Sequence, residues 1–212
     1  MGIPTREKVY RALEARHGAE LQKKFSGATV AVCGLGGLGS NIAIALARAG
    51  VGRLILIDFD KVDLANLNRQ QYAVSQIGKD KTEALKETLQ AVAPYVEIES
   101  HSVRITESNL AGLLCRADVI CEAFDRAEEK AMLVNGVLEK LPDKFLVAAS
   151  GMAGIASANS IKTRRVAGRF YLCGDGVSDS AENLGLISAR VMACAAHQAH
   201  MVLRILAGEE DA

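Results

Sequence analysis

The sequence has 212 residues, of which 50% are hydrophobic, and its 25 lysines and arginines balance 25 aspartates and glutamates. A chain of this length can bury the core of a single domain, and its zero net charge favours neither nucleic acid nor an anionic membrane as a partner. The five cysteines include no CxxC pair, which predicts a reducing, cytoplasmic setting and no structural zinc.

Two segments bear on secretion and membranes. Residues 1–16 are polar and lack the apolar run of a secretory signal. The most apolar late segment, 186–206, carries Arg190, Arg204 and two histidines. Because such side chains are costly inside a bilayer, we expect a soluble protein without a membrane-spanning helix.

The segment from Thr29 to Asp58 has the pattern of a nucleotide-binding unit. A β-branched run at 29–33 breaks into the glycine-rich GLGGLG, an alanine-rich helix over 40–49 follows, and a second buried strand at 53–58 ends in an acid. The glycines let backbone N–H groups approach phosphate, and the acid binds ribose hydroxyls. Asp58 lies about 20 residues past the glycines, where the ribose acid of a Rossmann unit belongs.

The rest of the chain supplies an N-terminal helix and further strands and helices. Residues 1–25 are predicted to form that helix, bent or broken near Gly18, ahead of one domain over 26–212. Asp80 and Glu83 have capping-box spacing at the start of a helix that Pro94 ends. The later predictions are strands at 96–103, 118–124, 145–149, 154–162 and 169–173, helices at 108–114, 128–139 and 187–206, and a loop at 174–185. This alternation predicts an α/β, Rossmann-like, doubly wound sheet that is mainly parallel, with an antiparallel C-terminal extension.

Residues 58–70, DFDKVDLANLNRQ, resemble the signature of the ubiquitin-activating-enzyme-like superfamily of ThiF/MoeB type. The resemblance covers about 26–208 and includes the glycine run, a lysine that opens the next helix and an aspartate that closes a later strand. The chain is most similar to compact ThiF-type adenylyltransferases of thiamine biosynthesis. The resemblance implies a homodimer that uses ATP and Mg²⁺ to adenylate the C-terminal glycine of a small ubiquitin-fold (ThiS-like) sulfur carrier, with a sulfur donor protein as a further partner.

The resemblance also implies roles for individual residues. The nucleotide-binding residues are Gly34, Gly36, Gly37, Gly39, Asp58, Asn66, Arg69, Gln70 and Lys81. The catalytic residues are Arg69, Lys81, Asp125 and Cys173, of which Asp125 is the Mg²⁺ ligand. Relatives also take an arginine from the partner subunit, for which Arg11 and Arg16 are the candidates.

Several of these residues have a structural alternative. Lys81 is also an ordinary first-turn lysine, and Asp125 also fits a helix N-cap completed by Glu128. Cys173 fits either sulfur transfer, if it is reachable beside the 174–185 loop, or a strand end. One departure from the family pattern is Arg126, where asparagine is common.

Three other classes of function remain open. The glycine motif and Asp58 alone fit an NAD-dependent oxidoreductase. A related activator of a tRNA base or of a molybdopterin sulfur carrier shares the ATP site, and a non-catalytic nucleotide-binding partner protein shares the fold. We expect the 174–185 loop to guide the glycine tail of the carrier.

Overall fold

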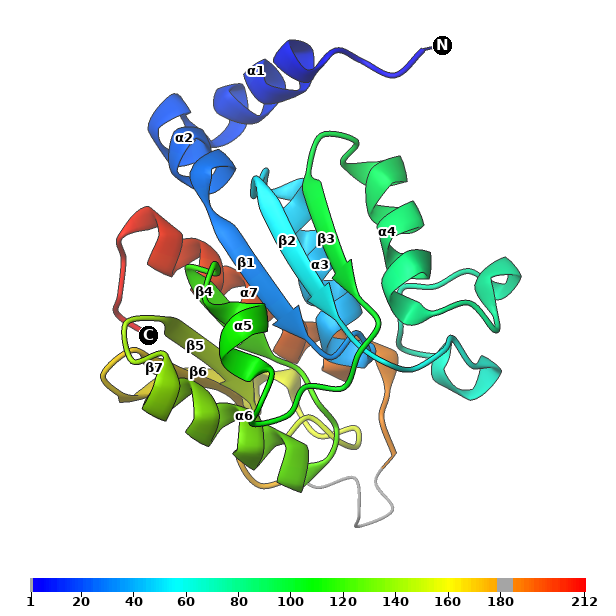
Figure 1. Cartoon of the computed structure of the whole chain (residues 1–212), viewed down its shortest axis with the longest axis vertical. Coiled ribbons are helices and arrows are strands. Elements are labelled where there is room, and N and C mark those ends of the chain that lie inside the picture. Colours follow the sequence, from blue (N-terminus) through cyan, green and yellow to red (C-terminus); the bar gives the residue numbers. More distant parts are fainter. Residues whose placement is uncertain (1, 179–184) are drawn as a thin grey trace.

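The computed structural model describes residues 2–178 and 185–212. Its strands form one sheet in the order β3-β2-β1-β4-β5-β7-β6 (Figure 1). In chain order they are β1 (Thr29–Cys33), β2 (Arg53–Ile57), β3 (Glu97–His101), β4 (Val119–Glu122), β5 (Phe145–Ala149), β6 (Lys162–Ala167) and β7 (Phe170–Gly174). All neighbours pair in parallel except β6 and β7, which are antiparallel. The predicted fold class is therefore confirmed.

Helices cover both faces of the sheet because β1 is buried on both sides. Val30 and Val32 pack into one apolar cluster, whereas Ala31 and Cys33 pack into another, as the two-residue period of a strand requires. The first cluster draws its helical residues from α3 (Gly37–Arg48), α4 (Lys81–Val92) and α7 (Ser188–Ala207). The second draws them from α5 (Leu110–Leu114) and α6 (Ala127–Lys140).

The strand order reverses between β1 and β4, and this point positions the site. Cys33 at the end of β1 lies opposite both Ile57 of β2 and Glu122 of β4. The carboxyl ends of the three strands therefore lie level, and the loops that follow them leave the same edge. Ligands of open α/β sheets bind at such a switch point.

The N-terminal region contains two helices, α1 (Arg6–His17) and α2 (Ala19–Gly27), which are separated at Gly18 with a φ of 92°. Figure 1 shows both beyond the amino ends of β1 and β2, at the edge opposite the switch point. Helix α1 buries none of its residues, and Arg11 pairs with Glu7 on its surface. Neither Arg11 nor Arg16 on α1 therefore lies near the switch point of its own chain.

Two local predictions are wrong. Residues 154–162 do not form a strand: Ala158–Ser160 is a 3₁₀ turn and β6 begins at Lys162. Carbonyl groups of this segment accept hydrogen bonds from the side chain of Arg190 on α7, so they do not pair with a neighbouring strand. The capping box at the start of α4 is also absent, because Asp80 makes no side-chain cap and pairs with Lys61 at 3.1 Å.

The predicted 174–185 loop lies partly outside the described residues, which omit 179–184. Within residues 2–178 and 185–212, no helix is long and apolar enough to cross a membrane.

Candidate functional site

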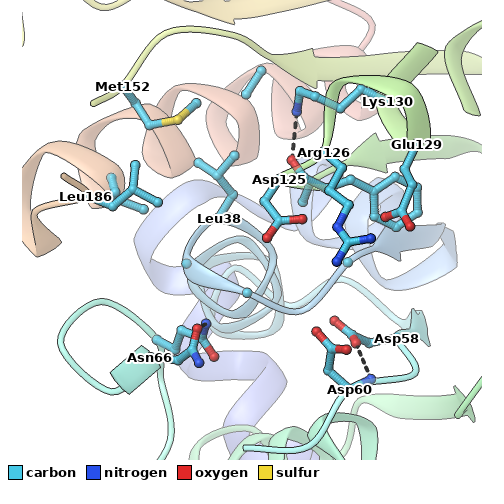
Figure 2. Close-up of a pocket in the computed structure, with 18 of the residues that line it drawn as sticks. Leu38, Asp58, Asp60, Asn66, Asp125, Arg126, Glu129, Lys130, Met152 and Leu186 are labelled. Atoms are coloured by element: carbon cyan, nitrogen blue, oxygen red, sulfur yellow. Dashed lines mark hydrogen bonds between the residues drawn. The ribbon is translucent and has the colours of Figure 1, made fainter. Parts of the chain in front are cut away.

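A cavity of about 640 Å³ opens at the carboxyl ends of β1, β2 and β4 (Figure 2). Its walls come from the glycine turn, from residues 57–70, from residues 123–130 and from Met152 and Leu186 on the far side. Nine of the predicted site residues line it: Gly34, Gly36, Gly37, Asp58, Asn66, Arg69, Gln70, Lys81 and Asp125. Gly39 and Cys173 do not line it. The family-like motifs thus come together in one pocket, although they span 92 residues of sequence (34 to 125).

The glycine turn brings backbone close to the cavity because its residues have no side chains. Gly34 has a φ of 91°, which favours glycine. Its N–H continues the sheet by donating to the carbonyl oxygen of Ile57. Gly36 forms the N-cap of α3, so the helix begins at the pocket and directs its unpaired N–H groups there. Such an N-terminus favours an anion.

Gly39 supports the turn from behind rather than lining the pocket. A Cβ atom at this position would lie 1.8 Å from the carbonyl oxygen of Gly34. A side chain at residue 39 would therefore push α3 away from the turn.

We expect Gly39→Ala to lower the free energy of unfolding by about 1–3 kcal/mol or more, since overpacking forces the backbone to move. Gly36→Ala is the matched control, because its Cβ atom would meet only Gln70 Nε2 at 3.8 Å. Urea unfolding followed by circular dichroism measures both changes. Equal destabilisation by the two variants would contradict the close packing of Gly39 on Gly34.

Asp58 is fixed on one wall by backbone donors. Its Oδ2 accepts from the N–H of Leu35 at 2.6 Å, and its Oδ1 accepts from the N–H of Asp60 at 2.8 Å. Burial raises the pKa of Asp58, although the positive charge of Lys81 and the two N–H groups oppose this shift. The carboxylate is thus held in place at the end of β2, where ribose hydroxyls are bound in Rossmann units.

Lys81 is buried beside this wall. Its Nζ lies 2.9 Å from Asp60 Oδ2 and 3.9 Å from Asp58 Oδ2, and 7% of its side chain is exposed. An ordinary first-turn lysine would extend into solvent, whereas this one points into the pocket at the start of α4. An ammonium group has three protons, so the pair with Asp60 leaves donors for a ligand.

A second wall carries the amide and guanidinium groups of 66–70. Asn66 Oδ1 accepts from Gln70 Nε2 at 3.0 Å and from Arg69 at 3.4 Å. Gln70 Oε1 is buried and has no hydrogen-bond partner among residues 2–178 and 185–212. An orphaned buried acceptor in a pocket wall is costly, and a ligand that donates a proton there would satisfy it. The donors and this acceptor together fit a polar ligand of the size of a nucleotide.

Asp125 follows β4 and points into the cavity (Figure 2). The alternative of a capping box with Glu128 is wrong, because the N-cap of α6 is Arg126 and no side chain caps this helix start. The Asp125 carboxylate makes no hydrogen bond or ion pair with the described residues. Among the same residues, no three His, Cys, Asp or Glu side chains cluster to hold a metal ion. Mg²⁺ is commonly bound by one carboxylate together with substrate phosphates and water, and Asp125 fits that role.

A buried ion pair behind Asp125 was missed in the sequence. Lys130 Nζ lies 2.9 Å from both carboxylate oxygens of Glu122 and also donates to the carbonyl oxygen of Phe124. Glu122 accepts in turn from the N–H of Phe124. Burial raises the pKa of Glu122, and Lys130 opposes this shift. The ion pair fixes the turn that carries Asp125. In the sequence, the only sign of this pair is that an acid, Glu122, ends an apolar strand.

The contact between Phe59 and Arg104 was also not predicted from the sequence. The guanidinium of Arg104 lies 3.9 Å from the centre of the Phe59 ring and pairs with Glu129. All three residues line the pocket, beyond Asp58. The sequence shows only a phenylalanine between two aspartates, and the structure leaves that phenylalanine exposed. This wall offers a flat surface to a ligand.

Cys173 is fully buried, which favours the strand-end alternative over a reachable thiol. It lies at the end of β7, where its sulfur is 3.5 Å from Thr163 Oγ1 and burial raises its pKa to about 11. A thiolate is the reactive form of cysteine, and this environment disfavours it. Sulfur transfer through Cys173 is therefore not part of the function that we propose.

We expect a thiol reagent to modify Cys115 quickly in the native protein and to leave Cys173 unmodified. Cys115 is exposed, whereas the other cysteines are buried. Peptide mass spectrometry after brief alkylation measures this, with urea-unfolded protein as the control in which every cysteine reacts. Modification of native Cys173 at the rate of Cys115 would restore it as a candidate.

The fold and the pocket define a Rossmann-like α/β domain with its binding site at the topological switch point. The chain belongs to the ThiF family, whose model matches residues 10–212. It is 53% identical over 78 residues to ubiquitin-like modifier-activating enzyme 5 of Caenorhabditis elegans, in a match that covers 37% of this chain and 19% of the relative. It is 36% identical over 109 residues to the probable adenylyltransferase/sulfurtransferase MoeZ of Mycobacterium tuberculosis, a match that covers 51% of this chain and 28% of that protein. The chain thus matches less than a third of either relative.

Solved structures share the fold. The Escherichia coli tRNA N6-threonylcarbamoyladenosine dehydratase TcdA, in complex with AMP, superposes with a TM-score of 0.86 over 99% of this chain and 98% of that one, at 19% identity. Escherichia coli MccB, in a structure with ATP, superposes with a TM-score of 0.71 over 91% of this chain and 59% of that one, at 21% identity. At such identities the likeness establishes the fold.

Proposed function

We propose that this protein is an adenylyltransferase that uses MgATP to activate the C-terminal carboxylate of a small ubiquitin-like carrier protein. One observation carries the proposal: the carboxylate of Asp125, which bonds to no residue that the structure describes, shares one pocket with the glycine turn, Lys81 and Arg69. A Mg²⁺ ion held by Asp125 supplies charge neutralisation on the phosphates. The pocket thus offers the cations and the phosphate cradle that adenylyl transfer needs.

The proposed reaction joins two anions, the carrier carboxylate and ATP. Catalysis therefore depends on aligning these two reactants and on neutralising their negative charge. A carboxylate oxygen of the carrier's last glycine forms a bond to the α-phosphorus of ATP. The bond from that phosphorus to the oxygen bridging to the β-phosphate breaks, and pyrophosphate leaves with its electron pair. Lys81 and Arg69 are positioned to offset the negative charge, and Asp58 to orient the ribose. No proton needs to move.

The carrier assignment is supported by the names of relatives. One is a ubiquitin-like modifier-activating enzyme and another is a probable adenylyltransferase/sulfurtransferase. We propose a ThiS-like sulfur carrier with a Gly-Gly terminus, and a role in thiamine biosynthesis, on the resemblance to compact ThiF proteins. We also propose a cytoplasmic homodimer, in which the exposed helix α1 brings Arg11 or Arg16 to the partner's pocket.

The test is ATP–pyrophosphate exchange with Mg²⁺, with and without carriers that end in Gly-Gly. The matched control is each carrier without its last glycine. Exchange that requires the intact tail supports acyl-adenylation. Bound ATP without exchange on any intact carrier would contradict it, and binding of NAD in preference to ATP would favour the oxidoreductase.

A second candidate is the activation of a tRNA base. It is favoured by the TcdA superposition, which covers nearly the whole of both chains. The balanced charge of this chain does not favour it, because RNA-binding surfaces are usually basic. ATP turnover that depends on tRNA rather than on a carrier would support this second function.

A further inference from the structure

We propose that Arg126 binds the phosphates of the nucleotide from within the same chain. The proposal rests on the proposed function, because it assumes that the pocket takes ATP. Arg126 lies at the N-cap of α6, directly after Asp125, and lines the pocket.

The first support is that the other cations of the pocket are already engaged. Four lysines and arginines that line it pair with acidic side chains: Lys61 with Asp80, Lys81 with Asp60, Arg104 with Glu129 and Lys130 with Glu122. Arg69 donates to the side chains of Asn68 and Asn66. Arg126 alone among the six makes no side-chain hydrogen bond or ion pair with the described residues.

The pairing also removes the simplest alternative, a salt bridge along helix α6. Glu129 is three residues after Arg126 and is the natural helical partner for it. In the structure Glu129 pairs with Arg104 instead, on the neighbouring wall. Glu122 is likewise committed to Lys130. Glu129 and Glu122 therefore both pair with other cations, and neither pairs with the guanidinium of Arg126.

The direction of the side chain is the second support. Figure 2 shows Arg126 extending from beside Asp125 into the cavity, toward the wall that carries Asp58 and Asp60. An arginine serving only solubility would extend away from a cavity. Its base is also fixed, because Lys130 bonds to the carbonyl oxygen of Phe124 in the same turn. The backbone that carries Arg126 is thus fixed beside the cavity that the glycine turn and Asp58 also line.

Phosphate is the ligand chemistry that matches this arrangement. A guanidinium presents parallel N–H donors that bind two phosphate oxygens at once. Helix α3 begins at Gly36 on the floor of the same cavity, where an anion is favoured. A phosphate placed there would meet the helix N-terminus on one side and Arg126 on the other. A carboxylate-bound metal at Asp125 would share that phosphate with Arg126.

The test measures dissociation constants for ATP, AMP and adenosine by isothermal titration calorimetry, without Mg²⁺ so that Asp125 contributes no metal. Arg126→Gln removes the charge and Arg126→Lys keeps it. Arg48→Gln is the matched control, since Arg48 is an exposed arginine at the far end of α3.

We expect Arg126→Gln to bind ATP about 10- to 100-fold more weakly, the usual cost of losing a hydrogen bond to a charged group. Adenosine binding should stay within about twofold, and Arg126→Lys should recover part of the ATP affinity. Unchanged ATP affinity in Arg126→Gln, or an equal loss for adenosine, would overturn the proposal. Wild-type protein that binds neither ATP nor AMP would overturn both proposals. Normal ATP binding without carrier-dependent exchange would remove only the proposed function.

Discussion

Asp125→Asn should lower carrier-dependent ATP–pyrophosphate exchange by about 100-fold or more, while the protein stays folded. The expected loss is large because an amide binds Mg²⁺ poorly, and the charge of the departing pyrophosphate then lacks its main partner. Stability should change little, since the Asp125 carboxylate bonds to none of the described residues. Initial exchange rates and urea unfolding curves measure the two effects separately.

Glu128→Gln is the control for this prediction. Glu128 is exposed in the first turn of α6, so its replacement removes the same charge from the same helix end. We expect its exchange rate to stay within about twofold of the wild type. An equal loss in both variants would mean that the general negative charge matters rather than a metal bound at Asp125.

The strands of the parallel sheet up to residue 149 could be predicted because their signals are local. Strands Thr29–Cys33 and Phe145–Ala149 occupy the predicted residues, since a short apolar run between turn residues is typical of a buried strand. The helix after the glycine turn begins at Gly37 rather than residue 40, because the last glycines themselves form its first turn. Residue spacing alone does not predict that α3 begins within the glycine turn.

The C-terminal part was harder because distant residues decide it. The 154–162 segment has a strand-like composition, yet its carbonyl groups are held by Arg190, some thirty residues further along the chain. No local pattern predicts that arrangement. The same holds for Cys173, whose burial depends on α7 packing over the end of β7.

In the candidate site, too, residues with a local sequence signal could be predicted, whereas residues defined by distant contacts could not. Motif spacing placed Asp58, Lys81 and Asp125 in one pocket, because the ends of parallel strands share one edge of the sheet. Motif spacing did not identify Glu122 and Lys130, which act by fixing the turn that carries Asp125. Supporting residues of this kind are recognised by their contacts, which the sequence does not contain.

Arg190 on α7 is another supporting residue of this kind, and its loss should destabilise the fold strongly. Its side chain is 4% exposed, and it donates to the carbonyl oxygens of Ala153, Ala156 and Ser157. It also forms an ion pair with Asp175, whose side chain is 6% exposed. One guanidinium thus joins α7 to the two segments that form the Met152 side of the pocket.

We expect Arg190→Met to lower the free energy of unfolding by about 3–5 kcal/mol at pH 7, because it leaves the buried Asp175 carboxylate without its cation. Urea unfolding measures the loss. The double variant Arg190→Met, Asp175→Asn should recover part of it, since no buried charge then remains unpaired. A loss below about 1 kcal/mol in the single variant would contradict this account.

The effect of Arg190→Met should also depend on pH. Burial alone would raise the pKa of Asp175, but hydrogen bonds from Ser178, Val177 and Arg190 lower it from 3.8 to about 2. The stability that this carboxylate contributes is therefore present above pH 3.8 and is lost as the pH falls toward 2. Protonation of Asp175 removes the charge that the guanidinium neutralises, so the stabilities of the wild type and Arg190→Met should converge as the pH falls from 3.8 toward 2. A difference that stays constant from pH 7 to about pH 2 would mean that the carbonyl contacts, rather than the ion pair, account for the role of Arg190.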